Sequence, residues 1–275
     1  MLTVTSADGT DVRAYDEGHG PAVVMLGPGL DDGTRGKKIA AILATRFRVV
    51  RLHRRQYRLD LKADPKLGSP SSIAQEVDDV LAVVRAVGQP VVLYGHSDGA
   101  VVALEALAAS PSSFVGAVIY EPPAVIGPPL AGEGGEVLKQ ARAALAAGRP
   151  GTAMAIFLRD VVELPRWAAW LAGMFTALIP KYRRLVPGQI DALEALDQIG
   201  VRLDTYAQIN VPTVLLGGDR SPAHLGERLD AIERVMPHTE RVVMHKRDHA
   251  ADAKHPRQVA GIIQTLADKV LHQHQ

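Results

Sequence analysis

A serine between two glycines is the residue of this chain best suited to covalent chemistry. Ser97 is the centre of the pentapeptide Gly95 to Gly99, which reads Gly-His-Ser-Asp-Gly. It directly follows a short apolar run, Val91 to Tyr94, and opens a helical pattern. A strand, a sharp turn and a helix are the context in which G-x-S-x-G presents an exposed serine hydroxyl as a nucleophile. The sequence therefore predicts Ser97 as the nucleophile, and the alternative is an ordinary glycine-flanked turn.

Histidine is the side chain that can take the proton of such a serine near neutral pH. His249 follows the apolar run Arg241 to Met244 and precedes the last helical pattern of the chain. His245 lies too close to the end of that run, and His255 abuts Pro256. Although His245 and His249 have the i, i+4 spacing of a metal pair, no third ligand accompanies them. We predict His249 as the base and no metal site.

Two carboxylates are candidates for the residue that orients His249. Glu121 directly follows the run Val115 to Tyr120, and Asp219 follows the run that ends near Leu216. Both would stand at the carboxyl edge of a parallel sheet, where such sheets build their sites. Either can instead be a solvated charge at a strand end, so the residues alone leave the acid open.

Two backbone amides are expected to hold the negative charge that develops on a substrate oxygen. One belongs to Asp98, the residue after the nucleophile, and the other to the loop that begins at Gly27. Pro28 has no N–H, which makes Gly29 the better donor of that loop. A dinucleotide-binding loop is a poor alternative because Gly33 comes one residue late for G-x-G-x-x-G. We predict no organic cofactor.

The elements that position these residues are visible as short apolar runs alternating with helical patterns, which is typical of a largely parallel sheet. Two further runs at the N-terminus flank Asp8-Gly9 and predict a hairpin. The predicted strands are Leu2–Thr5, Val12–Tyr15, Ala22–Leu26, Phe47–Leu52, Pro90–Tyr94, Val115–Tyr120, Val211–Leu216 and Arg241–Met244.

Three helices are predicted around this sheet. The clearest spans Ser72 to Val87, where Ser72 and Gln75 form a capping box and Gly88 would end the helix. The second follows Ser97 and ends before Pro111, and the third closes the chain from about Pro256.

The strand signal disappears between Pro122 and Thr205, where alanine-rich helical segments take over. We predict breaks at 148–151, Pro165, Pro180 and 187–188. Residues 1–122 and 206–275 would form the core, and 123–205 a helical cap inserted after the sixth strand. Five large apolar residues of the cap are predicted to line a substrate pocket, or else to pack the cap helices together: Phe157, Trp167, Trp170, Met174 and Phe175.

Composition limits the partners of the chain. Its 275 residues carry 31 Lys and Arg against 30 Asp and Glu, so no overall basic field favours nucleic acid or an anionic membrane. The absence of cysteine excludes disulfides and thiol nucleophiles. Without a signal-peptide pattern or a long apolar stretch, we expect a soluble, cytoplasmic protein with a small-molecule substrate. The oligomeric state is not predicted.

A basic segment, His53 to Arg58, follows the fourth predicted strand. It can bind an anionic group of a substrate, since arginine pairs well with carboxylates and phosphates. The alternative is a solvated loop.

From Val23 to Leu266 the chain resembles the α/β-hydrolase superfamily. The glycine-rich loop, the Ser97 pentapeptide, Tyr-Glu-Pro-Pro at 120–123 and the late His-Ala-Ala at 249–251 resemble cofactor-free esterases and lactone hydrolases, including the zearalenone lactone hydrolases. The resemblance implies an α/β-hydrolase fold with a cap after the sixth strand and Gly29 as oxyanion donor. In many relatives the acid follows the seventh strand, where Ser221 stands here, and the lactone hydrolases imply Glu121 instead. The chain departs from the pattern in having Leu26-Gly27 for the usual His-Gly.

These features together predict hydrolysis of a carboxylic ester or lactone through an acyl-enzyme on Ser97. A thioesterase, a C–C bond hydrolase or an acyltransferase would use the same residues. A binding protein that has kept the pocket and lost turnover is the alternative outside enzymes.

Overall fold

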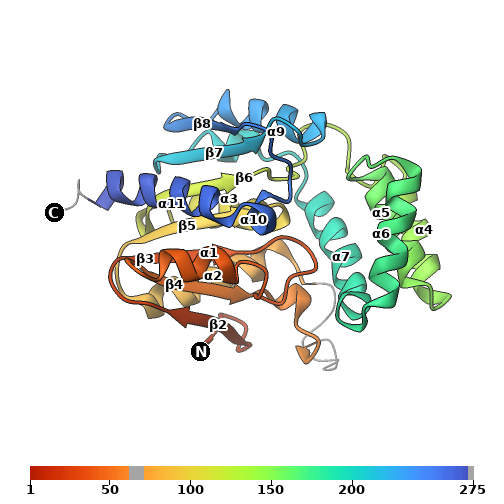
Figure 1. Ribbon diagram of the computed structural model, residues 1–275, viewed down its shortest axis with the longest axis horizontal. Coiled ribbons are helices and arrows are strands. Elements are labelled where there is room, and N and C mark those ends of the chain that lie inside the picture. The colour runs from red at the N-terminus through yellow and green to blue at the C-terminus, as the bar shows by residue number, and fades with distance from the viewer. Residues whose placement is uncertain (62–70, 272–275) are drawn as a thin grey trace.

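A twisted eight-stranded sheet forms the centre of the computed structural model, which describes residues 1–61 and 71–271 (Figure 1). The strand order is β1-β2-β4-β3-β5-β6-β7-β8. Strands β1 and β2 pair antiparallel with each other and β2 with β4, whereas all pairs from β4 to β8 are parallel. The strands are β1 Leu2–Thr5, β2 Asp11–Glu17, β3 Ala22–Leu26, β4 Arg48–His53, β5 Val91–His96, β6 Phe114–Tyr120, β7 Thr213–Gly218 and β8 Thr239–Met244.

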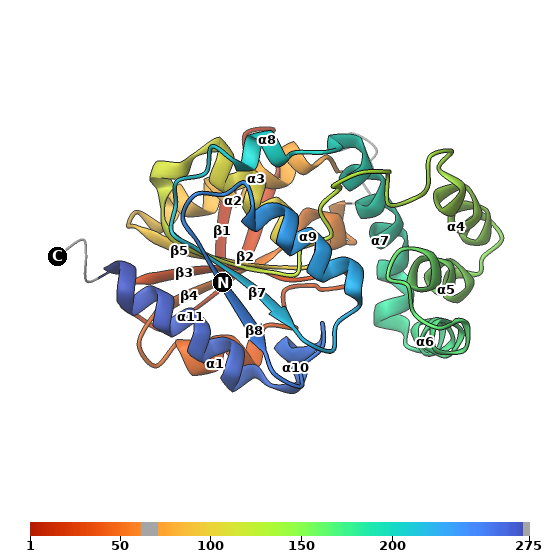
Figure 2. The ribbon, with the colours of Figure 1, turned by 90° about the horizontal axis from the view of Figure 1, so that it is seen from above.

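Helices cover both faces of this sheet, as the view from above shows (Figure 2). Every residue of β3 and β5 is buried, because a parallel sheet between two helical layers has no solvent face. One face packs against α1 Lys37–Leu43, α10 Ala251–Lys254 and α11 Pro256–Leu271, and the other against α2 Ile73–Val87, α3 Asp98–Ala109, α8 Leu203–Tyr206 and α9 Ala223–Glu233.

The predicted capping box of α2 is present. The Ser72 hydroxyl accepts from the Gln75 amide, and the Gln75 side chain accepts from the Ser72 amide. At the other end Gly88 takes a φ of 71°, the left-handed conformation in which helices commonly stop. The predicted mostly parallel sheet, its flanking helices and the helices inserted after the sixth strand are all confirmed.

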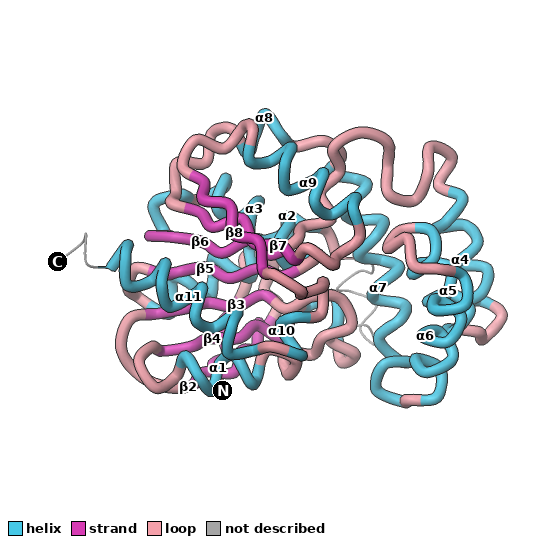
Figure 3. The backbone as a smooth tube through the Cα atoms, turned by 45° about the horizontal axis from the view of Figure 1, so that its top comes forward, coloured by secondary structure: helices cyan, strands magenta, loops and turns pink. Residues whose placement is uncertain are grey.

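Four helices follow β6 and lie at one end of the sheet rather than on its faces (Figures 1 and 3). We call them the inserted helices; they are α4 Glu136–Ala146, α5 Pro150–Asp160, α6 Arg166–Leu178 and α7 Pro180–Ile199. Three predicted breaks separate them, but the predicted break at 187–188 is wrong because α7 continues through Pro187. Proline has no N–H, so Pro187 donates no hydrogen bond to the carbonyl of Arg183 one turn earlier. Both residues are exposed, and water can donate to that carbonyl instead.

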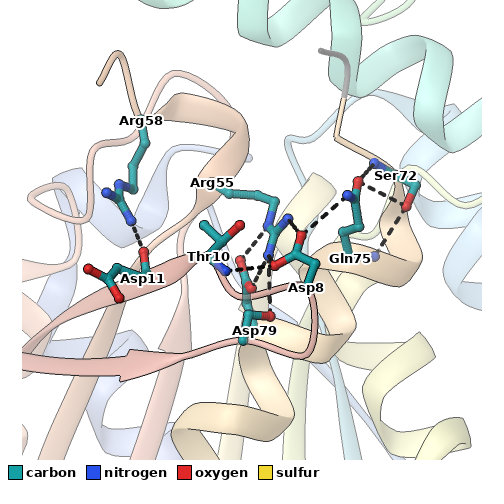
Figure 4. A network of polar contacts seen from close by, with 9 residues as sticks. Asp8, Thr10, Asp11, Arg55, Arg58, Ser72, Gln75 and Asp79 are labelled. Atoms are coloured by element: carbon teal, nitrogen blue, oxygen red, sulfur yellow. Dashed lines mark hydrogen bonds and ion pairs between the residues drawn. The ribbon is translucent and has the colours of Figure 1, made fainter. Parts of the chain in front are cut away.

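The basic segment after β4, His53 to Arg58, is largely buried, and its arginines form ion pairs. Both predictions for this segment, a substrate contact and a solvated loop, are therefore wrong. Arg55 Nε donates to Asp79 at 2.7 Å, and Arg55 Nη1 lies 2.6 Å from Asp8 (Figure 4). Arg54 lies 2.6 Å from Glu76. These guanidinium groups hold the N-terminal hairpin and α2 against the end of β4.

Helices long and apolar enough to cross a bilayer are not found among residues 1–61 and 71–271.

Candidate functional site

Ser97 occupies the sharp turn between β5 and α3. Its φ of 57° and ψ of −129° lie in a region that residues other than glycine rarely adopt, so the backbone here is strained. The turn needs its two glycines. A Cβ on Gly95 would lie 2.7 Å from the Cβ of Ala103, and a Cβ on Gly99 would lie 2.3 Å from the Gly27 carbonyl oxygen. The close approach places Ser97 at the N-terminal end of α3, where the first amides have no helical acceptor.

Glu121 and His249 meet at the carboxyl edge of the sheet. Glu121 directly follows β6 and is 1% exposed, and its Oε2 lies 2.6 Å from Nδ1 of His249. The Gly218 amide donates to Oε1 of the same carboxylate at 2.7 Å. The contact with Glu121 occupies Nδ1 of His249. Nε2 therefore remains available to a partner in the pocket that His249 and Ser97 both line. The structure thus brings the predicted nucleophile, base and one of the two candidate acids together.

The carboxylate is held in its ionised form. Burial alone would raise the pKa of Glu121, but the hydrogen bond and positive charge of His249 and the hydrogen bond from Gly218 bring this pKa below its usual value. An ionised Glu121 accepts two hydrogen bonds and fixes the His249 ring with Nδ1 protonated.

Asp219, the other candidate acid, lies beside a different histidine. Its Oδ2 is 2.7 Å from Nδ1 of His245, whose side chain is 78% exposed. Desolvation would raise the pKa of Asp219, but the hydrogen bond with His245 and those from the backbone of Lys246 and Arg247 together lower it below its usual value. Asp219 therefore belongs to a surface pair outside the group around Ser97.

His249 rests on a second histidine that the sequence interpretation did not use. The ring of His96 lies 4.7 Å from that of His249 and stacks on Tyr120 at 4.3 Å. Burial lowers the pKa of His96, which keeps its ring neutral in spite of the carboxylate of Asp252 at 3.4 Å. A neutral, stacked ring supports His249 by contact without adding a like charge.

A pocket of about 200 Å³ opens over Ser97 between the sheet edge and the inserted helices. The predicted amide donors Gly29 and Asp98 line it, as does Phe157. The other apolar residues of its wall are Pro28, Leu30, Pro123, Leu130, Met154, Leu158, Val161, Val162, Leu193, Leu196 and Leu225.

Four of the five predicted pocket residues lie elsewhere. Trp167, Trp170, Met174 and Phe175 are 69%, 62%, 38% and 59% exposed and do not line the pocket. The reason is the packing of α6 against α5 through its small residues, which turns the large side chains outward. The prediction of a tryptophan-lined pocket is corrected accordingly.

Four polar residues that the sequence analysis missed stand at the site, and one of them, Arg35, lines the pocket while it pairs with Asp252. Tyr57 donates to Oδ2 of Asp98 at 2.6 Å, and its hydroxyl lies 3.2 Å from Gln189, which enters the pocket from α7. His224 of α9 also lines the pocket, and burial with the nearby charge of Arg228 lowers its pKa. The sequence could have indicated Tyr57, because it is an aromatic residue within the basic segment after the fourth predicted strand. No motif marks Gln189 or His224.

In the described part of the chain, no three His, Asp or Glu side chains lie close enough together to hold a metal ion. The groups at the site can instead move a proton: a hydroxyl at Ser97, an imidazole at His249 and an ionised carboxylate behind it.

Comparisons with known proteins agree on the fold. The sequence model of the alpha/beta hydrolase family matches residues 18–262. An alpha/beta hydrolase from Sphaerobacter thermophilus is 24% identical, with a TM-score of 0.78 over 96% of this chain and 99% of that chain. A search of curated proteins found no match.

Two enzymes of described activity share the fold at lower identity. A thermophilic esterase from Thermogutta terrifontis is 18% identical, with a TM-score of 0.73 over 98% of both chains. An enzyme described as degrading N-acyl homoserine lactones is 18% identical, with a TM-score of 0.70 over 96% of this chain and 99% of that chain.

Proposed function

The chain belongs to the alpha/beta hydrolase family, and from that premise we propose that it hydrolyses a carboxylic ester or lactone through an acyl-enzyme on Ser97. The observation that carries the proposal is the 2.6 Å contact between Glu121 and His249 at the edge of a pocket that also holds Ser97. The strained backbone of Ser97 supports it, since strain of about 1–3 kcal/mol persists mainly where function requires it.

The first half of the reaction forms the acyl-enzyme. Nε2 of His249 takes the proton of Ser97 as Oγ attacks the substrate carbonyl, and Glu121 stabilises the resulting imidazolium. The amides of Gly29 and Asp98 donate to the oxyanion. When the tetrahedral intermediate collapses, His249 gives its proton to the leaving alcohol oxygen, which in a lactone stays attached to the acyl group.

The second half releases the acid. Water gives a proton to His249 as it attacks the acyl carbon, and the same proton returns to Ser97 Oγ when the ester bond breaks. The inserted helices act as a cap over the acyl pocket, and their apolar residues Met154, Phe157 and Leu158 exclude bulk water from the intermediate.

An esterase and a lactone-degrading enzyme are among the structures that share this fold, which is consistent with this proposal. At 18% identity, their structural similarity shows a common fold only. The substrate has to be determined by experiment.

A panel of p-nitrophenyl esters, lactones and acyl thioesters tests the proposed reaction. We expect ester or lactone turnover that falls roughly 10⁴- to 10⁶-fold in Ser97→Ala, with the thioesters turned over more slowly. Faster thioester turnover would move the assignment to a thioesterase. Binding of esters without turnover in the native protein would contradict the proposal and favour the non-catalytic alternative.

A further inference from the structure

The outer side of α6 carries a concentration of exposed apolar side chains. Figure 2 shows α6 at a lower corner of the inserted helices, directly beside α5. We call this surface the α6 apolar face; it consists of Trp167, Trp170, Met174, Phe175, Leu178, Ile179 and Tyr182, all at least 38% exposed. Both tryptophans of the chain are on it.

The helix is packed with its small residues inward. Its buried residues are Ala169, Gly173 and Thr176, spaced to lie on one side of the helix. A Cβ on Gly173 would lie 2.4 Å from the carbonyl oxygen of Gly151, so α5 and α6 approach too closely for a larger residue. A helix surrounded by water buries its large apolar residues, whereas small residues inward and large ones outward are typical of helices in lipid. We therefore expect the α6 apolar face to be in contact with another apolar surface.

Positive charge flanks this face at both ends, and negative charge is absent from it. Arg166 begins α6, and Lys181, Arg183 and Arg184 follow its end, all exposed. The sequence has no Asp or Glu from residue 164 to residue 190. Lys181 pairs with Asp32 at 2.9 Å, while Arg183 and Arg184 have no ion pair within the described ranges.

We propose that the α6 apolar face binds the surface of anionic lipid bilayers, with Trp, Phe and Leu side chains inserted among the acyl chains and the arginines at the headgroups. Aromatic residues and a basic flank are the features with which interfacial helices bind such membranes. A second copy of the chain fits less well, because a two-fold contact would bring like charges together without acidic partners. The net charge of the whole chain argues against a membrane partner. It is a sum over all residues, however, and does not show that basic residues gather at the two ends of this face.

Binding on this face would bring the pocket close to the lipid. Helix α5 contributes Met154, Phe157 and Leu158 to the pocket and packs against α6 with its other side. Two packed helices, α6 and α5, would then lie between the membrane and the pocket. The proposal does not depend on the reaction, since binding is measured without turnover.

Intrinsic fluorescence reports on this surface directly, because both tryptophans lie on it. We expect the emission of the native protein to shift to shorter wavelength when vesicles of phosphatidylglycerol and phosphatidylcholine are added, and much less with phosphatidylcholine alone. Cosedimentation with the same vesicles gives the partition coefficient.

Two double variants keep both tryptophans as reporters. Arg183→Gln/Arg184→Gln removes two cations and should weaken partitioning roughly 25-fold. Phe175→Ser/Leu178→Ser should abolish the spectral shift. Val243→Ser, which removes an apolar side chain that is 56% exposed on β8, is the matched control and should bind vesicles like the native protein.

An unchanged spectrum in the presence of anionic vesicles would overturn the proposal. So would a blue-shifted spectrum without vesicles that depends on protein concentration, with dimers in analytical ultracentrifugation, because a second copy would then cover the face.

Discussion

Among single residues, the choice between Glu121 and Asp219 decides how His249 is oriented. Glu121 is buried at the end of β6 and accepts from both His249 and the Gly218 amide. Asp219 lies on the surface with His245. Both carboxylates contact a histidine at nearly the same distance, so only burial and the position relative to Ser97 separate them.

Replacing Glu121 with glutamine should therefore lower turnover of the best ester by about 10⁴, as the equivalent change does in a serine protease, because the amide favours the wrong histidine tautomer. Asp219→Asn is the matched control and should change turnover less than about threefold, since it removes only a solvent-screened pair. Initial rates at saturating substrate measure both. The reverse pattern would assign the acid to Asp219.

The sequence predicts some residues of the candidate site and does not predict others. Ser97 is predicted because its glycines and the strand before it are contiguous in the chain. Trp167 and Trp170 are misplaced because an alanine-rich helix gives no indication of which side its neighbour will cover. Gln189 has no local signal, since only the packing of α7 against the core brings it to the pocket.

Among the elements, the contact between α3 and β3 sets the position of Ser97. Gly99 lies so close to the Gly27 carbonyl that the first turn of α3 touches the end of β3. This contact keeps Ser97 and the loop that carries Gly29 within one pocket.

Gly99→Ala should destabilise the protein by about 3 kcal/mol, because the added methyl group meets backbone atoms that cannot move independently. Gly226→Ala, in α9 with open space around its Cα, is the control and should stabilise the protein by about 0.5–1 kcal/mol through its higher helix propensity. Chemical denaturation gives both free energies of unfolding. Equal effects at the two positions would contradict the close contact.

A second contact, between α10 and the segment before α1, makes stability depend on pH. Arg35 donates to both oxygens of Asp252 at 2.6 and 2.9 Å. Burial would raise the pKa of Asp252, but these hydrogen bonds and the positive charge of Arg35 hold it well below its usual value. A lowered pKa in the folded state contributes stability that is present above the unfolded value and declines as pH falls through the folded value.

Asp252→Asn should accordingly cost about 3 kcal/mol at pH 7, toward the lower end for a buried pair because Arg35 is partly exposed. The difference from the native protein should be constant from pH 7 to about 5 and shrink below about pH 4. Denaturation midpoints across this range test it, and a difference that grows in acid would refute the ion-pair explanation.

Elements were predicted well where local chemistry determines them. The strands in the core read as continuous apolar runs because both faces are covered, and α2 carries its own capping box and terminal glycine. The course of α7 through Pro187 was not predictable, because whether a proline ends a helix depends on the solvent exposure of the carbonyl four residues earlier.

At the scale of the whole molecule, the inserted helices are coupled to the core through the end of β4. The Tyr57 hydroxyl contacts Asp98 of α3 and Gln189 of α7, and the Gln56 side chain donates to the Gly188 carbonyl of α7 at 3.0 Å. The pocket lies between the two parts, so its shape depends on these contacts.

Tyr57→Phe should reduce stability by about 1.5–3 kcal/mol, because it removes a buried hydrogen bond to a charged acceptor. Hydrogen exchange should accelerate in α7 more than in β5, since the hydroxyl joins α7 to the core. Tyr182→Phe, on the exposed end of the inserted helices, should change neither quantity. Uniform acceleration throughout the sheet would argue against a specific coupling.

Covalent labelling with a fluorophosphonate, read by mass spectrometry of the digested protein, tests directly whether Ser97 is a nucleophile. We expect one adduct per chain, on the peptide that contains Ser97, formed much more slowly in Glu121→Gln and absent in Ser97→Ala. An adduct on another residue, or no adduct on the folded native protein, would contradict the assignment of Ser97 as the nucleophile.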